Sequence, residues 1–525
     1  MGGFRIVVVS SAPANEISHL LARIAREAPG AQVAGVLCER REKPHSGFVR
    51  RAASNLGHSL LRFAQASSVK FSGLPPLLDA ALGHKCRSRG IEIRFSPDIE
   101  SAESREFVRS TRADLGVAFA MRADSPSILG LPPHGFICGP LCAFAANAAT
   151  PQWVVSVGLE TLESRPTRAI RSRSFPIDSF DSAVSLKLKS DLLGEDLLIE
   201  ALRDWSLAGS TDNWNKQESP AASSMTPANP LHFESRSRYR APRTRPAWKL
   251  ALRSSAYLWL LPFRNWTRRL RKRFPLVILF HHLVSDRPHP MGISTEAFLA
   301  QVQYLKRHYR LVSLAEGLRL LDSSSIDQPT AVLTFDDGYA DNFLAMRAVL
   351  RVEPAPVTMF VCPELIETGR AFPHDERDHR EGFAPLTTTE LGQMAVEGME
   401  IGSHTRTHFN CGSTEREVLE REIAGSRRDL ENLVGQAIPF FSFPWGKPAN
   451  MSEPAVEIAG KSYQHFFSAY GGANFPGVRG QHRVRSAHPH SLWELELTLQ
   501  QLLEIPRGDM ENLRARFEPA AVAQS

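Results

Sequence analysis

The strongest constraint on the fold of this chain is a pattern repeated through residues 275–515, where short apolar segments end in polar residues or glycine. These segments predict strands at residues 277–280, 331–335, 357–361, 399–403, 440–443 and 466–469. Helical spacing of apolar residues predicts helices at 296–308, 389–396, 414–433 and 492–503. Strands that alternate with helices and carry polar residues at their carboxyl ends are typical of a distorted parallel β/α barrel with its site on one face.

Residues 1–205 show a different pattern, which predicts a separate α/β domain. Buried strands are predicted at 6–9, 33–37, 115–119 and 154–157, with helices at 16–27 and 181–202. This alternation is typical of a doubly wound parallel sheet. The first strand is followed by Ser10-Ser11-Ala12-Pro13 and not by a glycine-rich phosphate loop, so we expect no nucleotide cofactor in this domain.

The basic residues are concentrated between the two domains, in a predicted linker at 206–274; residues 516–525 form a tail. Residues 231–275 hold 13 of the 62 Lys and Arg residues but one of the 56 acidic residues, so the net charge of +6 arises there. The rest shows no interleaved aromatic and basic pattern, and we expect no nucleic-acid partner. Within 247–273, cations flank tryptophans and leucines, which suits a helix on an anionic membrane surface or one packed on a neighbouring domain.

Length and composition indicate an ordinary globular protein of two large domains, with 525 residues, 42% of them hydrophobic and 22% charged. The six cysteines lack zinc-finger spacing and favour reduced thiols in a reducing compartment. The apolar run at 6–9 is too short for a signal peptide, and no run of about 18 apolar residues could span a membrane. We therefore expect a cytoplasmic protein that could attach peripherally at the inner membrane face.

Two motifs in the predicted barrel supply metal ligands. Asp336 and Asp337 end one strand before Gly338, which permits a tight turn, so one carboxylate can bind a metal while the other accepts a proton. His404 and His408 stand at i and i+4, where a helical turn would direct both imidazoles at one ion. Two imidazoles and one carboxylate leave positions open, as in a catalytic zinc site, although cobalt, nickel or manganese fits the same ligands.

These two motifs, together with the residues around them, resemble those of the polysaccharide deacetylase family, the family 4 carbohydrate esterases. The resemblance spans residues 275–515 and rests on the segments TFDDG at 334–338, SHTRTH at 403–408 and FSFPWG at 441–446. It implies that Asp336 is the general base and that Pro444 and Trp445 line the groove where the sugar ring stacks. It implies these metal ligands: Asp337, His404 and His408.

Two positions depart from the pattern of that family. Ser442 stands where many members carry an arginine that pairs with the base, so the pKa of Asp336 depends on another partner, Arg485 or backbone donors. The family's general acid is a histidine in the last motif. Segment 484–488 matches that motif best and assigns the role to His488, with further histidines close by at 482 and 490.

Other polar residues of the barrel have two interpretations. His282, at the end of the first predicted strand, either reaches the site or lies in the core with His281 exposed, and we favour the site. The acidic residues of the predicted helix 414–433 alternate with arginines, which indicates a solvated helix face without a functional role. They are Glu415, Glu417, Glu420 and Glu422.

The N-terminal domain resembles the formyltransferase family that uses a folate one-carbon donor. The similar segments are ADLGVAF at 113–119, PHGFI at 133–137 and FPID at 175–178. That family places an asparagine and a histidine just after the Gly-Phe-Ile strand, whereas residues 138–142 read CGPLC here. Without them acyl transfer loses its proton transfer and its oxyanion contact, so we expect a fold with little or no activity. His134 is either a remnant of the site or a solvated loop residue.

The sequence thus supports two functional hypotheses. The first is a metal-dependent hydrolase, with zinc the favoured metal, that removes an N-acetyl or N-formyl group from an amino sugar of a polysaccharide or lipid-linked glycan, in an envelope or exopolysaccharide pathway. The second is a catalytically weakened carbohydrate-binding or scaffold protein built on the same barrel, which the serine at position 442 favours.

Overall fold

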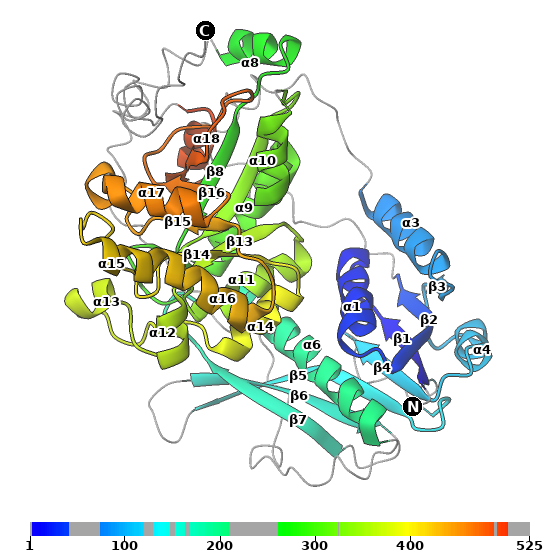
Figure 1. Ribbon diagram of the computed structural model, residues 1–525. Coiled ribbons are helices and arrows are strands. Elements are labelled where there is room, and N and C mark those ends of the chain that lie inside the picture. Colours follow the sequence, from blue (N-terminus) through cyan, green and yellow to red (C-terminus); the bar gives the residue numbers. More distant parts are fainter. Residues whose placement is uncertain are drawn as a thin grey trace. The chain divides into compact units, whose positions relative to one another are not determined.

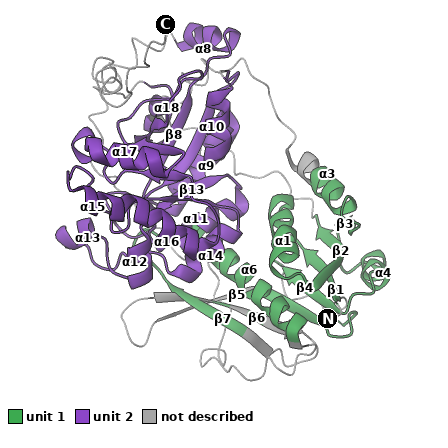
Figure 2. Ribbon diagram, viewed as in Figure 1, with its two compact units in different colours: residues 1–54, 69–237 green, residues 55–68, 238–525 purple. Residues whose placement is uncertain are grey.

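Two sheets organise the chain in this computed structural model, which describes residues 3–40, 74–119, 128, 130–146, 153–162, 168–208, 261–323, 325–487 and 491–501. One sheet belongs to a unit of residues 1–54 and 69–237, the other to a unit of residues 55–68 and 238–525 (Figure 2).

The first unit is built on a seven-stranded sheet with the strand order β3-β2-β1-β4-β5-β6-β7 (Figure 1). Its strands are β1 (Phe4–Ser10), β2 (Ala31–Glu39), β3 (Glu92–Ser96), β4 (Leu115–Phe119), β5 (Phe136–Ala146), β6 (Trp153–Leu162) and β7 (Arg168–Pro176). Its helices are α1 (Ala14–Glu27), α3 (Leu74–Arg87), α4 (Ala102–Ser110) and α6 (Ala183–Ala208).

The doubly wound α/β class predicted for this unit is confirmed. Central strand β1 is buried on both faces, as expected of a parallel strand covered by helices. Val108 of α4 packs with Val7 and Val9 of β1, and α6 contacts β5 and β6. The sheet is parallel from β3 to β5, but β6 runs antiparallel to both of its neighbours, β5 and β7. Residues 147–152 and 163–167 join these last strands, and they are too few for a parallel crossover of about a dozen residues.

The second unit contains a nine-stranded parallel sheet with the order β17-β16-β15-β14-β13-β12-β8-β18, in which β11 also pairs with β12. Its strands are β8 (Leu276–His281), β11 (Arg310–Leu311), β12 (Thr330–Phe335), β13 (Val357–Val361), β14 (Glu400–Ser403), β15 (Phe440–Ser442), β16 (His465–Ser468), β17 (His482–Val484) and β18 (Ser486–Ala487). A separate pair comprises β9 (Leu283–Val284) and β10 (Gly292–Ile293).

Helices alternate with these strands and lie outside them (Figure 1). They are α8 (Leu261–Leu270), α9 (Thr295–His308), α10 (Leu314–Asp322), α11 (Asp341–Val352), α12 (Pro363–Thr368), α13 (Pro373–Arg377), α14 (Thr388–Val396), α15 (Arg416–Leu419), α16 (Ser426–Val434), α17 (Glu453–Ser462) and α18 (Leu492–Leu499). A π-helical segment, η4 (Glu420–Gly425), joins α15 to α16, and η5 (Pro448–Asn450) is a short 3-10 turn. In the part of the chain with assigned structure, no helix is long and apolar enough to cross a membrane.

The segment around Arg485 nearly closes the barrel by pairing with both ends of the sheet. Strands β17 and β18 are consecutive in sequence and separated by this one residue, yet β17 pairs with β16 while β18 pairs with β8. One extended segment therefore bridges the two ends of the sheet, and the parallel β/α barrel predicted for this half is confirmed. The register aligns Phe335 with His281, and Ser403 with both Val361 and Phe441, so the carboxyl ends of β8, β12, β14 and β15 lie on one face.

The close approach of β13 and β14 generates a prediction about stability. A Cβ atom at Gly402 would lie 2.5 Å from the ring of Phe360, which is fully buried in the core. We expect Gly402→Ala to lower the free energy of unfolding by about 1–3 kcal/mol, because the ring must shift within a packed interior.

Urea denaturation of the full chain measures this change. Gly392→Ala is the matched control, since a Cβ atom there meets nothing within 4 Å inside α14, and it should stabilise the protein by roughly 0.5–1 kcal/mol. An unchanged unfolding midpoint for Gly402→Ala would contradict the packing of these two strands.

Candidate active site

The turn after β12 places two carboxylates in the mouth of the barrel. Asp336 donates its backbone N–H to the carbonyl of His281, 2.8 Å away on the neighbouring strand. Asp337 and Gly338 both have positive φ, 71° and 91°, and a Cβ atom at Gly338 would lie 2.9 Å from Val361. The chain therefore reverses at once, and the two adjacent side chains enter different environments.

His404 and His408 meet in a loop and not on a helical turn. His404 follows β14 directly, and residues 404–410 form no helix. Positive φ values of 63° at Thr405 and 59° at His408 redirect the backbone, so that both imidazoles face Asp337. The helical expectation was wrong because the strand ends at the first histidine, but the convergence of the two side chains is present.

Glu422 holds this loop in place, which corrects the expectation of a solvated glutamate. It is buried in the π-helical segment η4, and its carboxylate accepts hydrogen bonds from the backbone N–H groups of Arg406 and Thr407, each 3.1 Å away. It also accepts one from the Thr407 hydroxyl at 3.1 Å. The extra residue of the π turn directs this side chain inward, and such turns are frequent at functional sites.

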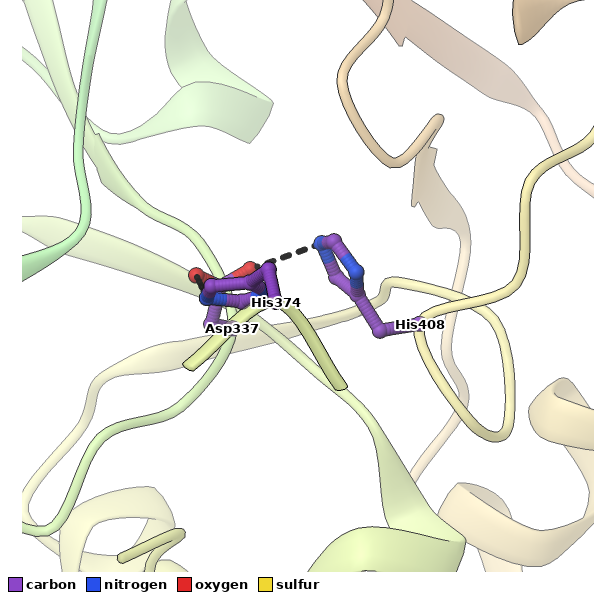
Figure 3. A group of neighbouring side chains, drawn as sticks. All are labelled: Asp337, His374 and His408. Atoms are coloured by element: carbon purple, nitrogen blue, oxygen red, sulfur yellow. Dashed lines mark ion pairs between the residues drawn. The ribbon is translucent and has the colours of Figure 1, made fainter. Parts of the chain in front are cut away.

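The carboxylate of Asp337 is surrounded by imidazoles but forms no ordinary hydrogen bond. Its Oδ1 lies 3.2 Å from Nε2 of His408 and 3.4 Å from Nε2 of His404, and its Oδ2 lies 3.7 Å from Nε2 of His374. Both oxygens are buried and lack a hydrogen-bond partner among the described residues. Figure 3 shows Asp337, His374 and His408, whose ligand atoms lie within 4.8 Å of one another.

These spacings fit a shared metal ion. Ligands about 2.1 Å from a tetrahedral zinc ion lie about 3.4 Å from one another, longer than a strong hydrogen bond. Burial raises the pKa of Asp337, but the imidazoles of His408 and His404 outweigh it and hold that pKa well below its usual range. A buried, ionised carboxylate with two unpartnered oxygens is a donor set suited to a divalent cation.

The tautomer of His404 is set by the backbone. Its Nδ1 lies 2.8 Å from the carbonyl oxygen of Ser442, an acceptor, so Nδ1 carries a hydrogen and Nε2 is the nitrogen that faces Asp337. A ligating histidine usually donates its other N–H in this way.

Asp336 is bound to Arg485, which takes the place of the arginine absent at position 442. The two form a bidentate pair, with Nη1–Oδ1 and Nη2–Oδ2 both at 2.7 Å, and Arg485 is fully buried. Arg485 also donates to the hydroxyls of Ser442 at 2.5 Å and Thr334 at 3.1 Å. Burial raises the pKa of Asp336, but the charge of Arg485 outweighs it and the net pKa is lowered, so the carboxylate is ionised at neutral pH.

The two histidines at the end of β8 separate. His281 is a core residue, buried, stacked on Phe335 with ring centroids 5.0 Å apart and 3.2 Å from Gln301. His282 is half-buried and lies within electrostatic reach of Asp337 and Asp336. Burial lowers its pKa more than these carboxylates raise it, so the imidazole is neutral. Of the two histidines, His282 is therefore the one placed at the carboxylates.

Pro444 and Trp445 follow β15 on the same face. Pro444 is buried, whereas Trp445 is 39% exposed and its ring centroid lies 4.6 Å from that of His408. Its φ of 57° turns the indole outward, beside the candidate metal ligands. His488 lies outside the described residues. His482 is half-buried and 2.8 Å from the hydroxyl of Ser468, which gives it a structural partner.

His374 is the site residue that the sequence did not reveal. It lies on α13, in the long connection between β13 and β14, with no strand end or repeated motif beside it. Arg485 was one of two possible partners of Asp336, and its position between β17 and β18 could not be read from the pattern. A proline-initiated turn, Phe372-Pro373-His374, is the one local signal, and it is weak.

Comparisons with known proteins agree with this geometry. Residues 324–463 match the family model "Polysaccharide deacetylase". A relative named "Putative polysaccharide deacetylase YxkH", from Bacillus subtilis (strain 168), is 26% identical over 221 residues, which are 41% of this chain and 73% of that protein.

Two solved structures are similar at low TM-scores. The Streptococcus pyogenes deacetylase PplD in complex with acetate has a TM-score of 0.37 and 22% identity, covering 44% of this chain and 99% of that one. Glycinamide ribonucleotide transformylase 1 from Symbiobacterium toebii has a TM-score of 0.26 and 14% identity, covering 39% of this chain and 88% of that one. The fold assignment therefore rests on the strand orders above, and the family resemblance rests on the sequence match of residues 324–463 to the polysaccharide deacetylase model.

Proposed function

We propose that residues 275–515 form a metal-dependent hydrolase that removes an N-acetyl, or N-formyl, group from an amino sugar of a polysaccharide or lipid-linked glycan. The observation that carries the proposal is the division between adjacent carboxylates, with Asp337 facing imidazoles and Asp336 paired with Arg485. The family match at 324–463 supports the substrate class.

In this proposal Asp337, His404 and His408 hold the cation, most simply Zn²⁺ given two imidazoles and a carboxylate. When bound, the cation supplies Lewis acidity that polarises the acyl carbonyl and lowers the pKa of the attacking water. Asp336 accepts the proton of that water, and Arg485 keeps Asp336 ionised and aimed. Pro444, Trp445 and His282 border the sugar, and His488 donates a proton to the leaving amine.

The role of Asp336 can be separated from metal binding. Asp336→Asn keeps the shape of the side chain but removes the proton acceptor, so we expect metal content to persist while acyl release falls by about 100-fold or more. Metal analysis and chromatography of released acetate and formate, on N-acetylated and N-formylated amino-sugar oligomers, measure the two properties.

Asp327→Asn, on the exposed loop before β12, is the matched control and should change neither property. Turnover unchanged in Asp336→Asn would remove that residue from the mechanism. Glycan binding without acyl release by the metal-loaded wild type would favour the second hypothesis, a carbohydrate-binding or scaffold protein.

The ion pair at the base generates a stability prediction. Arg485→Ala leaves the buried carboxylate of Asp336 without a counter-charge, and we expect a loss of about 3–5 kcal/mol in the free energy of unfolding. Adding Asp336→Asn removes the stranded charge and should restore part of that loss. Guanidinium unfolding of both variants tests this, and equal stability of the single and double variants would contradict it.

We also propose peripheral attachment to an anionic membrane surface from the cytoplasmic side, through the segment 247–273. Of that segment the structure describes 261–273, where α8 docks through polar contacts such as Arg264 with Gln500 at 2.8 Å. Its apolar residues Phe263, Trp266 and Leu270 are 56–64% exposed and lie among cations. An exposed apolar stripe with a basic rim suits an anionic lipid surface. The five cysteines whose side chains the structure describes are free and buried, which supports the cytoplasmic side.

Vesicle binding tests this attachment. We expect the chain to sediment with phosphatidylserine-containing vesicles and less with neutral phosphatidylcholine, with binding weakened by salt. Phe263→Ala with Trp266→Ala should reduce sedimentation strongly, because both side chains would insert at the interface. Val396→Ala, which changes an exposed apolar residue on α14, is the control. Equal sedimentation of the double variant and wild type would contradict the role of α8.

A further inference from the structure

A third imidazole stands at the carboxylate of Asp337, beside its other oxygen. Nε2 of His374 lies 3.7 Å from Oδ2 of Asp337, whereas His404 and His408 face Oδ1. The ring centroids of His374 and His408 are 4.8 Å apart, and both residues are buried (Figure 3). The carboxylate is thus approached by imidazole nitrogens on both of its oxygens.

A buried network fixes the position of His374. Its Nε2 lies 2.7 Å from the hydroxyl oxygen of Tyr339, which lies 2.7 Å from Oδ2 of Asp375. Asp375 is fully buried and its other oxygen is 3.0 Å from Arg380 and 3.1 Å from His289. The short helix α13 is therefore anchored from within, and the imidazole is held at the carboxylate by more than its own backbone.

The hydrogen-bond directions in this network follow from its carboxylate. Asp375 can only accept, so Tyr339 donates its hydrogen to Asp375, and the tyrosine oxygen accepts from Nε2–H of His374. Nδ1 of His374 is then bare, and it is buried without a hydrogen-bond partner in the described parts of the chain. The carboxylate of Asp375 thus holds the ring of His374 beside Asp337 through the hydroxyl of Tyr339.

We propose that His374 is a further ligand of the cation held by Asp337, His404 and His408, and that Tyr339 and Asp375 hold its ring beside Asp337 until the cation binds. This inference rests on the cation of the proposed function but not on hydrolysis. The nitrogen of His374 nearest Asp337 is Nε2, so ligation through it requires the ring hydrogen to leave Nε2 and one to bind Nδ1, which keeps the ring neutral. Tyr339 then keeps its hydrogen bond to Asp375 and loses its hydrogen bond to Nε2 of His374.

Copper provides a direct count of imidazole ligands. The full chain is loaded with Cu²⁺, which imidazoles bind well, and the nitrogen hyperfine pattern of its electron paramagnetic resonance spectrum is recorded. We expect three imidazole nitrogens in the wild type and one fewer in His374→Ala. His374→Phe, whose ring can stack on Phe372 as the imidazole does, is the second variant in case the alanine variant does not fold. Competition with a chromophoric chelator should show about 10-fold weaker binding in both.

His465→Gln is the matched control, because His465 begins β16 and so lies at the amino ends of the strands, whereas the candidate ligands follow the carboxyl ends. It should leave the number of nitrogen donors unchanged. Two nitrogens in the wild type, or the same number in wild type and both His374 variants, would overturn the inference and leave the hydrolase proposal standing. Three nitrogens together with no acyl release from any glycan would support the role of His374 and overturn the hydrolase instead.

Discussion

The buried pair between Asp336 and Arg485 connects the closure of the barrel to the candidate chemistry. Arg485 occupies the break between β17 and β18, and its guanidinium crosses the barrel to the residue that follows β12. Removing two charges from water is costly, and here the cost is offset by bidentate geometry, by the hydroxyls of Ser442 and Thr334, and by the rings of Phe280 and Phe360, 4.9 and 5.1 Å from the guanidinium carbon. A small residue at 442 is consistent with this arrangement, because the arginine arrives from another strand.

The charge balance of the barrel mouth follows from this pair. Asp336 is neutralised by Arg485, so the carboxylate of Asp337 is left with imidazoles alone. Burial lowers the pKa of His374 to about 4 despite the opposing effect of Asp337, and His282 is likewise neutral. A buried negative charge next to neutral nitrogen donors attracts a cation more than it attracts a proton donor. Electrostatics therefore assigns different tasks to two residues that are adjacent in sequence.

Strand positions and motif residues could be predicted from the sequence because they depend on local periodicity. The strands at 331–335 and 357–361 match β12 and β13, and the helix at 296–308 matches α9. The path of the backbone after each strand could not be predicted in this way, since positive φ at Thr405 and His408 depends on Glu422, 14 positions beyond His408 in sequence. His374 was missed for the same reason, because its position is set by Tyr339 and Asp375 and by no pattern around it. The direction of β6 relative to β5 and β7 depends on the lengths of the connections at 147–152 and 163–167, and the pattern of apolar residues within the strands carries no information on these lengths.

The single residue between β17 and β18 also has a consequence for biosynthesis. Ribosomes make the chain from the amino end, so a nascent polypeptide that stops before position 485 already contains Asp336, Asp337, His404 and His408 but has neither the bridging strand nor the guanidinium. Until residue 485 has been translated, the carboxylate that follows β12 lacks the charge that pairs with it in the folded chain. Closure of the barrel and the counter-charge of Asp336 therefore depend on the same late-translated segment.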